Sequence, residues 1–417
     1  MYSHEDYQNR INALFERHQS VQSAGFTSDA YKPGLDGMLA LSDSLGNPHF
    51  KFKSIHVAGT NGKGSVCSML AASLAGAGLR VGLYTSPHLL DFRERIKLVE
   101  AGSFSMIGED EVLEFLDMVD LEDRSFFEIT TAMAFWWFAR QNVDYAVIEV
   151  GLGGLLDSTN IITPELSVVT SIGLDHCAIL GNTRAEIAAQ KAGIFKPGVP
   201  ALVWGRDAET EPVFARCAES AGALLYFAED YSSGSLESDI DSPSKAVNIK
   251  TVSAAMDILG LPSCPDSIAS AAAITGFHGR WELIGRNPDT ICDIGHNPAA
   301  LELSFRKLES SGRPLYIIYG VMADKDLDGI APLMPVNAHY YLVAPRTVRA
   351  LKVDSLQARL ASIRPELGTE RYSSVADGVA AAIGAARNED DAIVFIGGST
   401  FVVSEAVEYI QTLNIQL

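Results

Sequence analysis

The sequence predicts an α/β protein with two domains, each built on a mostly parallel sheet. Two observations lead to this prediction. From residue 54 onward, short apolar runs of β-forming residues alternate with longer runs of helical periodicity, the pattern of βαβ units whose sheet is covered by helices. This alternation stops near residue 276 and restarts after residue 288, which indicates a second sheet.

The first block reaches from the N-terminus to the interruption near residue 276. Helical periodicity occurs around 7–15 and 35–45, with a loop at 23–29 between them, and a polar loop at 229–245 precedes a helix over 248–259. The apolar run 132–139 is too short to span a bilayer and is expected to be a buried helix. The predicted strands are 55–58, 80–84, 145–150, 166–172 and 199–204, and the predicted helices between them are 65–78, 109–119, 126–142 and 183–193.

The second block has about 130 residues, the size of a compact Rossmann-like domain. We expect a hinge at 276–288, and we therefore divide the chain into domains 1–285 and 286–417. The predicted strands are 290–294, 315–320, 340–343 and 392–396, and the predicted helices are 297–310 and 373–387.

Composition narrows the class of protein. A length of 417 residues suits two domains, and a formal charge of −20 argues against nucleic acid or an anionic membrane as a partner. The five cysteines are scattered without a C-x-x-C pair, so neither zinc nor a disulfide framework is indicated. The first residues lack the pattern of a secretory signal. We expect a cytoplasmic protein.

The most informative stretch is residues 54–65, SIHVAGTNGKGS. A strand leads into a glycine-rich turn with Lys63, and a helix of small residues follows. Such a turn directs backbone N–H groups at a phosphate, while the helix N-terminus and the lysine add positive charge. The spacing departs from G-x-x-x-x-G-K-[ST], because Gly64 stands between Lys63 and Ser65. A generic glycine turn is the alternative.

Further polar groups follow the other predicted strands of the first domain. Ser86, Glu149 and His176 stand at or just beyond strand ends, where ligands of open α/β sheets bind and where magnesium would be needed beside phosphates. Glu149 could instead merely end its strand, and His176 could be an ordinary histidine. Lys191 lies among small residues on a helix, and the residues alone favour a lysine that extends to the solvent.

The second domain has its own strand-end groups. Asp293 and His296 precede Asn297 and Pro298, which are suited to cap and begin a helix. Two more loops are expected at strand ends, 324–326 and 397–404. Arg280 lies in the expected hinge, where it could clamp a phosphate when the domains close.

Taken in order, these motifs resemble the folylpolyglutamate synthase/dihydrofolate synthase family, within the Mur ligase superfamily. The resemblance covers nearly the whole chain, and many motifs in sequence make it specific. It rests on residues 34–36, 59–65, 86–89, 127–131, 149–160, 173–176, 191–194, 279–282, 293–298, 324–326 and 398–404.

The resemblance implies a P-loop, Mur-ligase-like ATPase domain followed by the Rossmann-like domain. It also implies an ATP-dependent amide ligase: ATP phosphorylates a carboxylate of dihydropteroate or a reduced folate, and L-glutamate attacks the acyl phosphate. The implied cofactors are ATP, magnesium at two sites and a lysine carbamate at Lys191, with a monovalent cation as a further candidate. We expect small-molecule substrates and a monomer.

The resemblance assigns roles residue by residue. Those expected at ATP are Gly59, Thr60, Asn61, Gly62, Lys63, Gly64, Ser65, Asn248, Arg280 and Asp293. Those expected at the metal are Ser86, Glu149, His176 and carbamylated Lys191, and the catalytic group would comprise Lys63, Lys191, Glu149 and His176. Phe127 and Asp157 resemble folate-site positions, and Asp293, His296 and Ser404 resemble glutamate-site positions.

The chain departs from the family pattern at five positions. The family usually has arginine at positions 37 and 155, where this chain has Gly37 and Leu155. It often has glutamate where Gln190 stands, proline where His278 stands, and glutamine where Lys245 stands. The lost arginines bear on the preference for long polyglutamate tails more than on the use of ATP.

Two other functions remain open at this point. A different Mur-type ligase could join an amino acid to a cell-wall precursor, although there is little room for a nucleotide-sugar domain before residue 59. A P-loop switch could hydrolyse ATP without ligation. It would leave the conjunction of Lys191, Asp293 and His296 unexplained.

Overall fold

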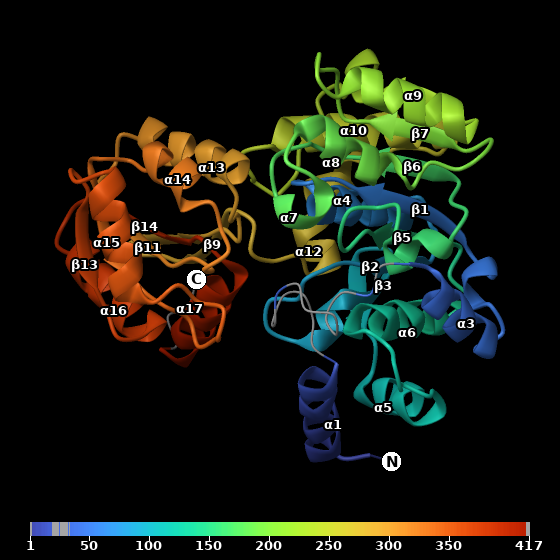
Figure 1. Cartoon of the computed structure of the whole chain (residues 1–417), viewed down its shortest axis with the longest axis horizontal. Helices are drawn as coiled ribbons and strands as arrows, with labels where there is room; N and C mark the ends of the chain where they lie inside the picture. Colours follow the sequence, from blue (N-terminus) through green and yellow to red (C-terminus); the bar gives the residue numbers. More distant parts are fainter. Residues whose placement is uncertain (1, 19–24, 26–31, 33, 414–417) are drawn as a thin grey trace. The chain divides into compact units, whose positions relative to one another are not determined.

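The computed structural model describes residues 2–18, 25, 32 and 34–413, so most of the loop predicted at 23–29 lies outside the described residues. The chain forms two compact units (Figure 1). Unit 1 comprises Met1–Asp239 and Lys245–Phe277, and unit 2 comprises Ile240–Ser244 and His278–Leu417. The division therefore falls after residue 277 and not after residue 285, and unit 2 also takes a short segment from the expected polar loop.

Unit 1 is built on an eight-stranded sheet with the order β4-β3-β2-β5-β1-β6-β7-β8. All neighbours from β2 to β8 pair in parallel, whereas β3 pairs antiparallel with β2 and β4. The five predicted strands are present, and β3, β4 and β8 were not predicted. The strands are β1 Lys53–Ala58, β2 Val81–Tyr84, β3 Ile96–Glu100, β4 Ser103–Met106, β5 Tyr145–Glu149, β6 Leu166–Val169, β7 Pro200–Val203 and β8 Leu224–Phe227.

Helices flank this sheet, and each helix predicted for the first block is present within a few residues. Ser125 begins α6 with a capping box, because its side chain accepts from the Glu128 N–H while the Glu128 side chain accepts from the Ser125 N–H. The helices are α1 His4–Arg17, α3 Asp36–Ser44, α4 Lys63–Gly76, α5 Glu109–Met118, α6 Phe126–Arg140, α7 Cys177–Leu180, α8 Arg184–Ala192, α9 Glu211–Ala221, α10 Lys245–Leu259, α11 Pro265–Ala269 and α12 Ala271–Thr275, with short 3-10 turns η1 Pro48–Phe50, η2 Phe92–Arg95, η3 Ser158–Ile161 and η4 Ala228–Asp230.

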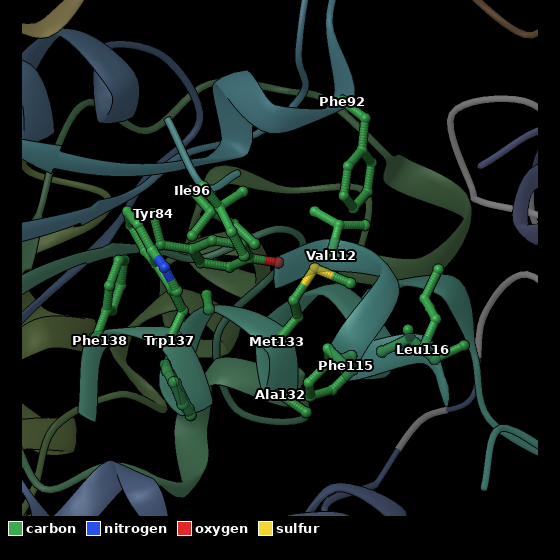
Figure 2. Packing of buried hydrophobic residues seen from close by; sticks show 14 of the residues in the cluster. Tyr84, Phe92, Ile96, Val112, Phe115, Leu116, Ala132, Met133, Trp137 and Phe138 are labelled. Carbon is green, nitrogen blue, oxygen red and sulfur yellow. The ribbon is translucent and has the colours of Figure 1, made fainter. Parts of the chain in front are cut away.

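The largest core of unit 1 surrounds α6, which is apolar on nearly every side. Met133, Phe135 and Phe138 of this helix have no exposed surface, as predicted for a buried helix. Figure 2 shows Met133 and Ala132 among side chains of α5, including Phe115. This packing places the N-terminal end of α6, with Phe127, beside the strand-end loops.

Unit 2 is built on a six-stranded sheet with the order β13-β12-β11-β14-β10-β9. All pairs are parallel except β9 with β10. Its strands are β9 Glu282–Gly285, β10 Asp289–Cys292, β11 Leu315–Tyr319, β12 Ala338–Leu342, β13 Gly368–Arg371 and β14 Ile393–Gly397. Its helices are α13 Pro298–Ser310, α14 Leu327–Ile330, α15 Val353–Ile363, α16 Val375–Ala386 and α17 Thr400–Thr412, with η5 Ala331–Leu333.

Two predictions for this region are corrected. Residues 282–285, expected within the hinge, form β9, because the short run Glu282–Gly285 pairs with β10 across a tight turn at Asn287. The loop predicted at 397–404 ends early: Ser399 accepts from the Val402 N–H and caps α17, so Ser404 lies in a helix. No helix among the described residues is long and apolar enough to cross a membrane.

Candidate active site

The glycine-rich turn joins β1 to α4 as predicted. Gly59 and Gly62 have φ angles of 150° and 89°, backbone conformations that residues with a side chain rarely adopt. Gly62 is the N-cap, and Lys63 begins the helix two residues earlier than predicted. Ser65 therefore lies in the first turn, where the free N–H groups of a helix point out of its N-terminus.

Residues after β6 hold the turn in shape. The Thr60 N–H donates to the Ser171 carbonyl (2.7 Å), and the Ser171 hydroxyl donates to the Asn61 carbonyl (3.0 Å). The Thr170 hydroxyl lies 2.8 Å from the same carbonyl, and a Cβ atom at Gly59 would lie only 1.8 Å from that hydroxyl. Sequence reasoning did not assign Thr170 a role, since a hydroxyl at a strand end carries no distinctive signal.

The unusual Gly64 has a packing reason. A Cβ atom at this position would lie 3.1 Å from Cε2 of Phe277 and 3.6 Å from Oε2 of Glu149. Gly62 is covered similarly, because its Cβ atom would lie 2.7 Å from Oδ1 of Asn248. Asn248, predicted at the nucleotide, thus lies against the turn. The contact of Phe277 was not predicted.

Two lysines meet at one carbonyl of the turn. The Lys63 ammonium donates to the carbonyls of Gly59 (3.1 Å) and Thr60 (3.3 Å), and Lys191 of α8 donates to the Gly59 carbonyl (2.8 Å). Lys191 is buried, so the interpretation as a lysine extending to solvent is wrong. Burial lowers the pKa of Lys191 to about 7, with a further contribution from the charge of Lys63.

Ser86 and Glu149 meet at the ends of the neighbouring strands β2 and β5. The Ser86 N–H donates to Oε2 of Glu149 (3.0 Å), and Glu149 is 4% exposed. This neighbourhood follows from the parallel pairing, which aligns strand ends at one edge of the sheet.

His176 lies on the loop after β6 and is the N-cap of α7, in the left-handed conformation with φ 52°. Its Nε2 atom lies 3.9 Å from Oδ2 of Asp175. Within the described ranges, no group of three or more His, Cys, Asp and Glu side chains is arranged to hold a metal ion. The predicted metal set therefore depends on Ser86 and a modified Lys191 as well as on Glu149 and His176.

The predicted folate-site residues border the glycine loop after β5. A Cβ atom at Gly151 would lie 2.4 Å from the Phe127 ring, so this ring lies directly on the loop. Asp157 accepts from the N–H groups of Leu152 (2.8 Å) and Thr159 (3.0 Å). Burial raises the pKa of Asp157. The Phe127 ring of α6 and the buried carboxyl of Asp157 thus both lie at this loop.

In unit 2, Asp293 ties together the segment that precedes β9 and the loop after β10. Its carboxylate accepts from the N–H groups of Gly295 (2.6 Å) and Trp281 (3.1 Å), and its Oδ1 atom lies 3.5 Å from Nη1 of Arg280. His296 Nδ1 lies 3.1 Å from the Ile294 carbonyl. The predicted cap is confirmed, since Asn297 accepts from the Ala300 N–H and Pro298 begins α13.

Two departures from the family pattern have local explanations. A Cβ atom at Gly37 would lie 2.3 Å from Oε1 of Glu128, so a side chain at this position would require the Glu128 carboxylate to move. His278 Nδ1 lies 2.8 Å from Glu282, which also accepts from the Gly279 N–H. Leu155, by contrast, is 46% exposed and has room for a longer side chain.

The fold and the site define the class. The model of the Mur ligase middle domain matches residues 57–260, and that of the Mur ligase glutamate ligase domain matches residues 279–399. The protein is therefore an ATP-dependent ligase of the Mur type.

Relatives narrow the class to a family. The chain is 33% identical to a folylpolyglutamate synthase of Lacticaseibacillus casei, over 75% of this chain and 82% of that one. It is also 33% identical to a dihydrofolate synthase/folylpolyglutamate synthase of Escherichia coli, over 85% and 86%. The protein belongs to the folylpolyglutamate synthase/dihydrofolate synthase family.

Solved structures agree with this assignment. The fold matches E. coli FolC in complex with DHPP and ADP, with a TM-score of 0.83, 27% identity and 98% of each chain covered. It also matches a bifunctional folylpolyglutamate synthase/dihydrofolate synthase with Mn, AMPPNP and L-glutamate bound, with a TM-score of 0.82, 26% identity, and coverage of 97% of this chain and 98% of that one.

Proposed function

We propose that this protein joins L-glutamate to dihydropteroate, to reduced folates, or to both, at the expense of ATP. The observation that carries the proposal is the convergence of Lys63 and buried Lys191 on the Gly59 carbonyl, beside a turn shaped for phosphate. We expect it to act on small molecules as a cytoplasmic monomer. Its strongly negative charge disfavours nucleic acid as a partner.

The turn would hold the nucleotide. Backbone N–H groups of residues 59–65 would bind the phosphates, and Lys63 would exchange its loop carbonyls for phosphate oxygens. Asn248 contacts Gly62 and would adjoin the nucleotide from α10. In unit 2, Arg280 would contribute a cation, with its guanidinium oriented by Asp293.

A divalent metal fits the strand-end groups. Glu149 is a buried carboxylate next to Ser86, and buried carboxylates are retained where they are paired or ligate metals. Ser86, Glu149, His176 and carbamylated Lys191 would hold magnesium in up to two sites, and a monovalent cation could share the same oxygens. Magnesium would neutralise the charge of the phosphates during transfer.

Lys191 has the environment that carbamate formation requires. The neutral amine attacks CO₂, its nitrogen bonds to the carbon, and one proton leaves, which gives an anionic carbamate. A buried amine whose pKa is about 7 is substantially neutral at physiological pH. Carbamate formation would replace the Lys191 ammonium, the second cation at the Gly59 carbonyl, with a carboxylate-like ligand.

The acceptor and L-glutamate would meet where the γ-phosphoryl group is transferred. Phe127 would stack on the pterin ring, and Asp157 would hydrogen-bond to it. The acceptor carboxylate would take the phosphoryl group, and the glutamate amine would attack the acyl carbon and release phosphate. His296, Ser404 and Asp293 would bind L-glutamate in unit 2, and water must be excluded because acyl phosphates hydrolyse.

An acceptor panel tests this function. Purified protein with ATP, magnesium and L-glutamate is given dihydropteroate, tetrahydrofolate or a cell-wall precursor carboxylate, and ADP release and product mass are measured. ADP formation with either pterin, with a mass gain of glutamate, supports the proposal. Turnover only with the cell-wall precursor would favour another Mur-type ligase, and ATPase activity independent of glutamate would favour a switch.

A further inference from the structure

A buried lysine outside the candidate site holds the end of a helix. Lys97 lies on β3 and is 4% exposed, and its ammonium donates to the carbonyls of Thr275 (2.8 Å) and Gly276 (2.6 Å). The same ammonium lies 5.2 Å from the centre of the Phe104 ring on β4. A cation at a helix C-terminus satisfies carbonyls that lack helical partners and matches the negative end of the helix dipole.

The backbone at this end of α12 is closely constrained. Gly276 has φ 56°, and a Cβ atom there would lie 2.2 Å from the Phe104 ring. The Phe277 N–H donates to the Ala272 carbonyl (3.0 Å), which closes the helix end. Lys97 and Phe104 therefore fix residues 275–277 from the β3–β4 hairpin.

The residue fixed in this way touches the phosphate turn. Cε2 of Phe277 lies 3.1 Å from the position of a Cβ atom at Gly64, in the first turn of α4. Phe277 is also the last residue of unit 1 before the chain passes into unit 2. A continuous set of contacts thus leads from Lys97 through the end of α12 to the turn.

We propose that Lys97 is a positioning residue for the nucleotide: it holds the end of α12 so that the Phe277 ring supports Gly64 and the phosphate turn. The arrangement has a cost, since burial lowers the pKa of Lys97 to about 8. An apolar residue on β3 would avoid that cost, but it would leave the two carbonyls without this donor. The inference rests on the proposed binding of ATP at the turn.

The test is a double-mutant cycle read by nucleotide affinity. Lys97→Met, Phe277→Ala and the double variant are compared with the unaltered protein for ADP binding by calorimetry with magnesium, and for the KM values of ATP and L-glutamate. Lys53→Met is the control, because Lys53 begins β1, at the end of that strand away from the turn, and its ammonium lies 5.5 Å from the centre of the Tyr145 ring.

If Lys97 acts through Phe277, each single variant weakens ADP binding about tenfold, the size expected for one lost buried polar contact, and the double variant is no weaker than either. The KM for L-glutamate and the Lys53→Met protein stay within about twofold of the unaltered values. Three outcomes would overturn the proposal: the losses of ADP affinity multiply in the double variant, the KM values for ATP and L-glutamate rise equally, or ADP binding is unchanged in the single variants.

Two further measurements keep this result separate from folding and from the proposed function. Lys97→Arg retains the charge and the donors, so ADP affinity is expected to stay within about threefold even if Lys97→Met does not fold; a loss as large as in Phe277→Ala would contradict the role of the charge. If the unaltered protein binds no ADP, the assignment of the turn fails rather than the role of Lys97.

Discussion

At the scale of single residues, Lys191 changes character most between sequence and structure. Small neighbours on its helix make it look like a surface lysine, yet its side chain is buried and donates to the Gly59 carbonyl. The carbonyl lies more than 130 positions earlier in the chain, so no local pattern could reveal the contact. Its chemistry follows from burial, which favours the neutral amine.

We predict that Lys191→Ala abolishes ligation and that added bicarbonate does not restore it, because alanine cannot form a carbamate. ADP release with dihydropteroate and L-glutamate measures the loss. In the unaltered protein, ¹³C-labelled bicarbonate should produce a carbamate resonance that is missing from the variant. Near-normal turnover in Lys191→Ala would refute the carbamate role.

The pKa of Lys191 also predicts how stability varies with pH. Between its folded value of about 7 and its ordinary value near 10.5, the unfolded chain binds more protons, so stability rises with pH across this range. Lys97 acts in the same direction, from about 8 upward. In Lys191→Met, the free energy of unfolding should rise less between pH 7 and pH 10. Urea unfolding in buffer free of CO₂ measures it. An unchanged slope would contradict the buried, neutral amine.

Lys63 provides a second test at this scale. Lys63→Ala should lose ATP-dependent turnover by more than about a hundredfold, as expected when a preorganised charge at a phosphoryl group is removed, while the fold is retained. Steady-state kinetics and circular dichroism measure the two parts. An unchanged rate would count against the phosphate assignment.

At the scale of elements, the junction of β1 and α4 is specified by contacts from other parts of the chain. Thr170 and Ser171 come from the end of β6, Asn248 comes from α10, and Phe277 follows α12. A Cβ atom at Gly59 would clash with Thr170, and one at Gly62 or Gly64 would require Asn248 or Phe277 to shift. The motif is continuous in the sequence, but contacts with distant segments fix its conformation.

Gly59→Ala should therefore abolish ADP binding, because its Cβ atom would lie 1.8 Å from the Thr170 hydroxyl at a φ of 150°. Gly78→Ala is the matched control: Gly78 also has a positive φ, of 86°, but nothing lies within 4 Å of its Cβ position. That control should lose about 1 kcal/mol of stability and keep its ADP affinity. Calorimetry and urea unfolding distinguish the two. Equal ADP affinity in both variants would refute the steric argument.

At the scale of the whole molecule, one short strand lies close to the boundary between the two units. β9 follows the second crossing of the chain into unit 2, after Phe277, and pairs with β10, so it belongs to the second sheet. Its four residues lie among glycines, arginines and asparagine, which is why the sequence favours a hinge there. Because of this composition, the sequence does not indicate that the second sheet begins at Glu282.

A fragment of residues 278–417 should accordingly be more stable than a fragment of residues 286–417, because the second lacks β9 and exposes the edge of β10. Urea unfolding of both fragments gives the comparison. If the shorter fragment is as stable as the longer one, β9 contributes nothing to the fold of unit 2.

The sequence by itself determined the α/β class, most of the parallel strands and the position of the glycine-rich turn between β1 and α4. These features come from hydrophobic runs and glycines that act within a few positions of the chain. The edge strands β4, β8 and β9, and β3 next to the edge, escaped prediction, because short strands of four or five residues often carry too weak a pattern. The antiparallel pairing of β3 with β2 could not be inferred either.

Only the tertiary structure decided which strand-end groups meet and what state they take. Ser86 and Glu149 are neighbours because β2 pairs with β5, and Lys191 is buried because α8 packs its side chain toward the turn. Burial, and with it the pKa and the chemistry of a lysine, depends on contacts between distant segments. Local sequence carries no record of those contacts.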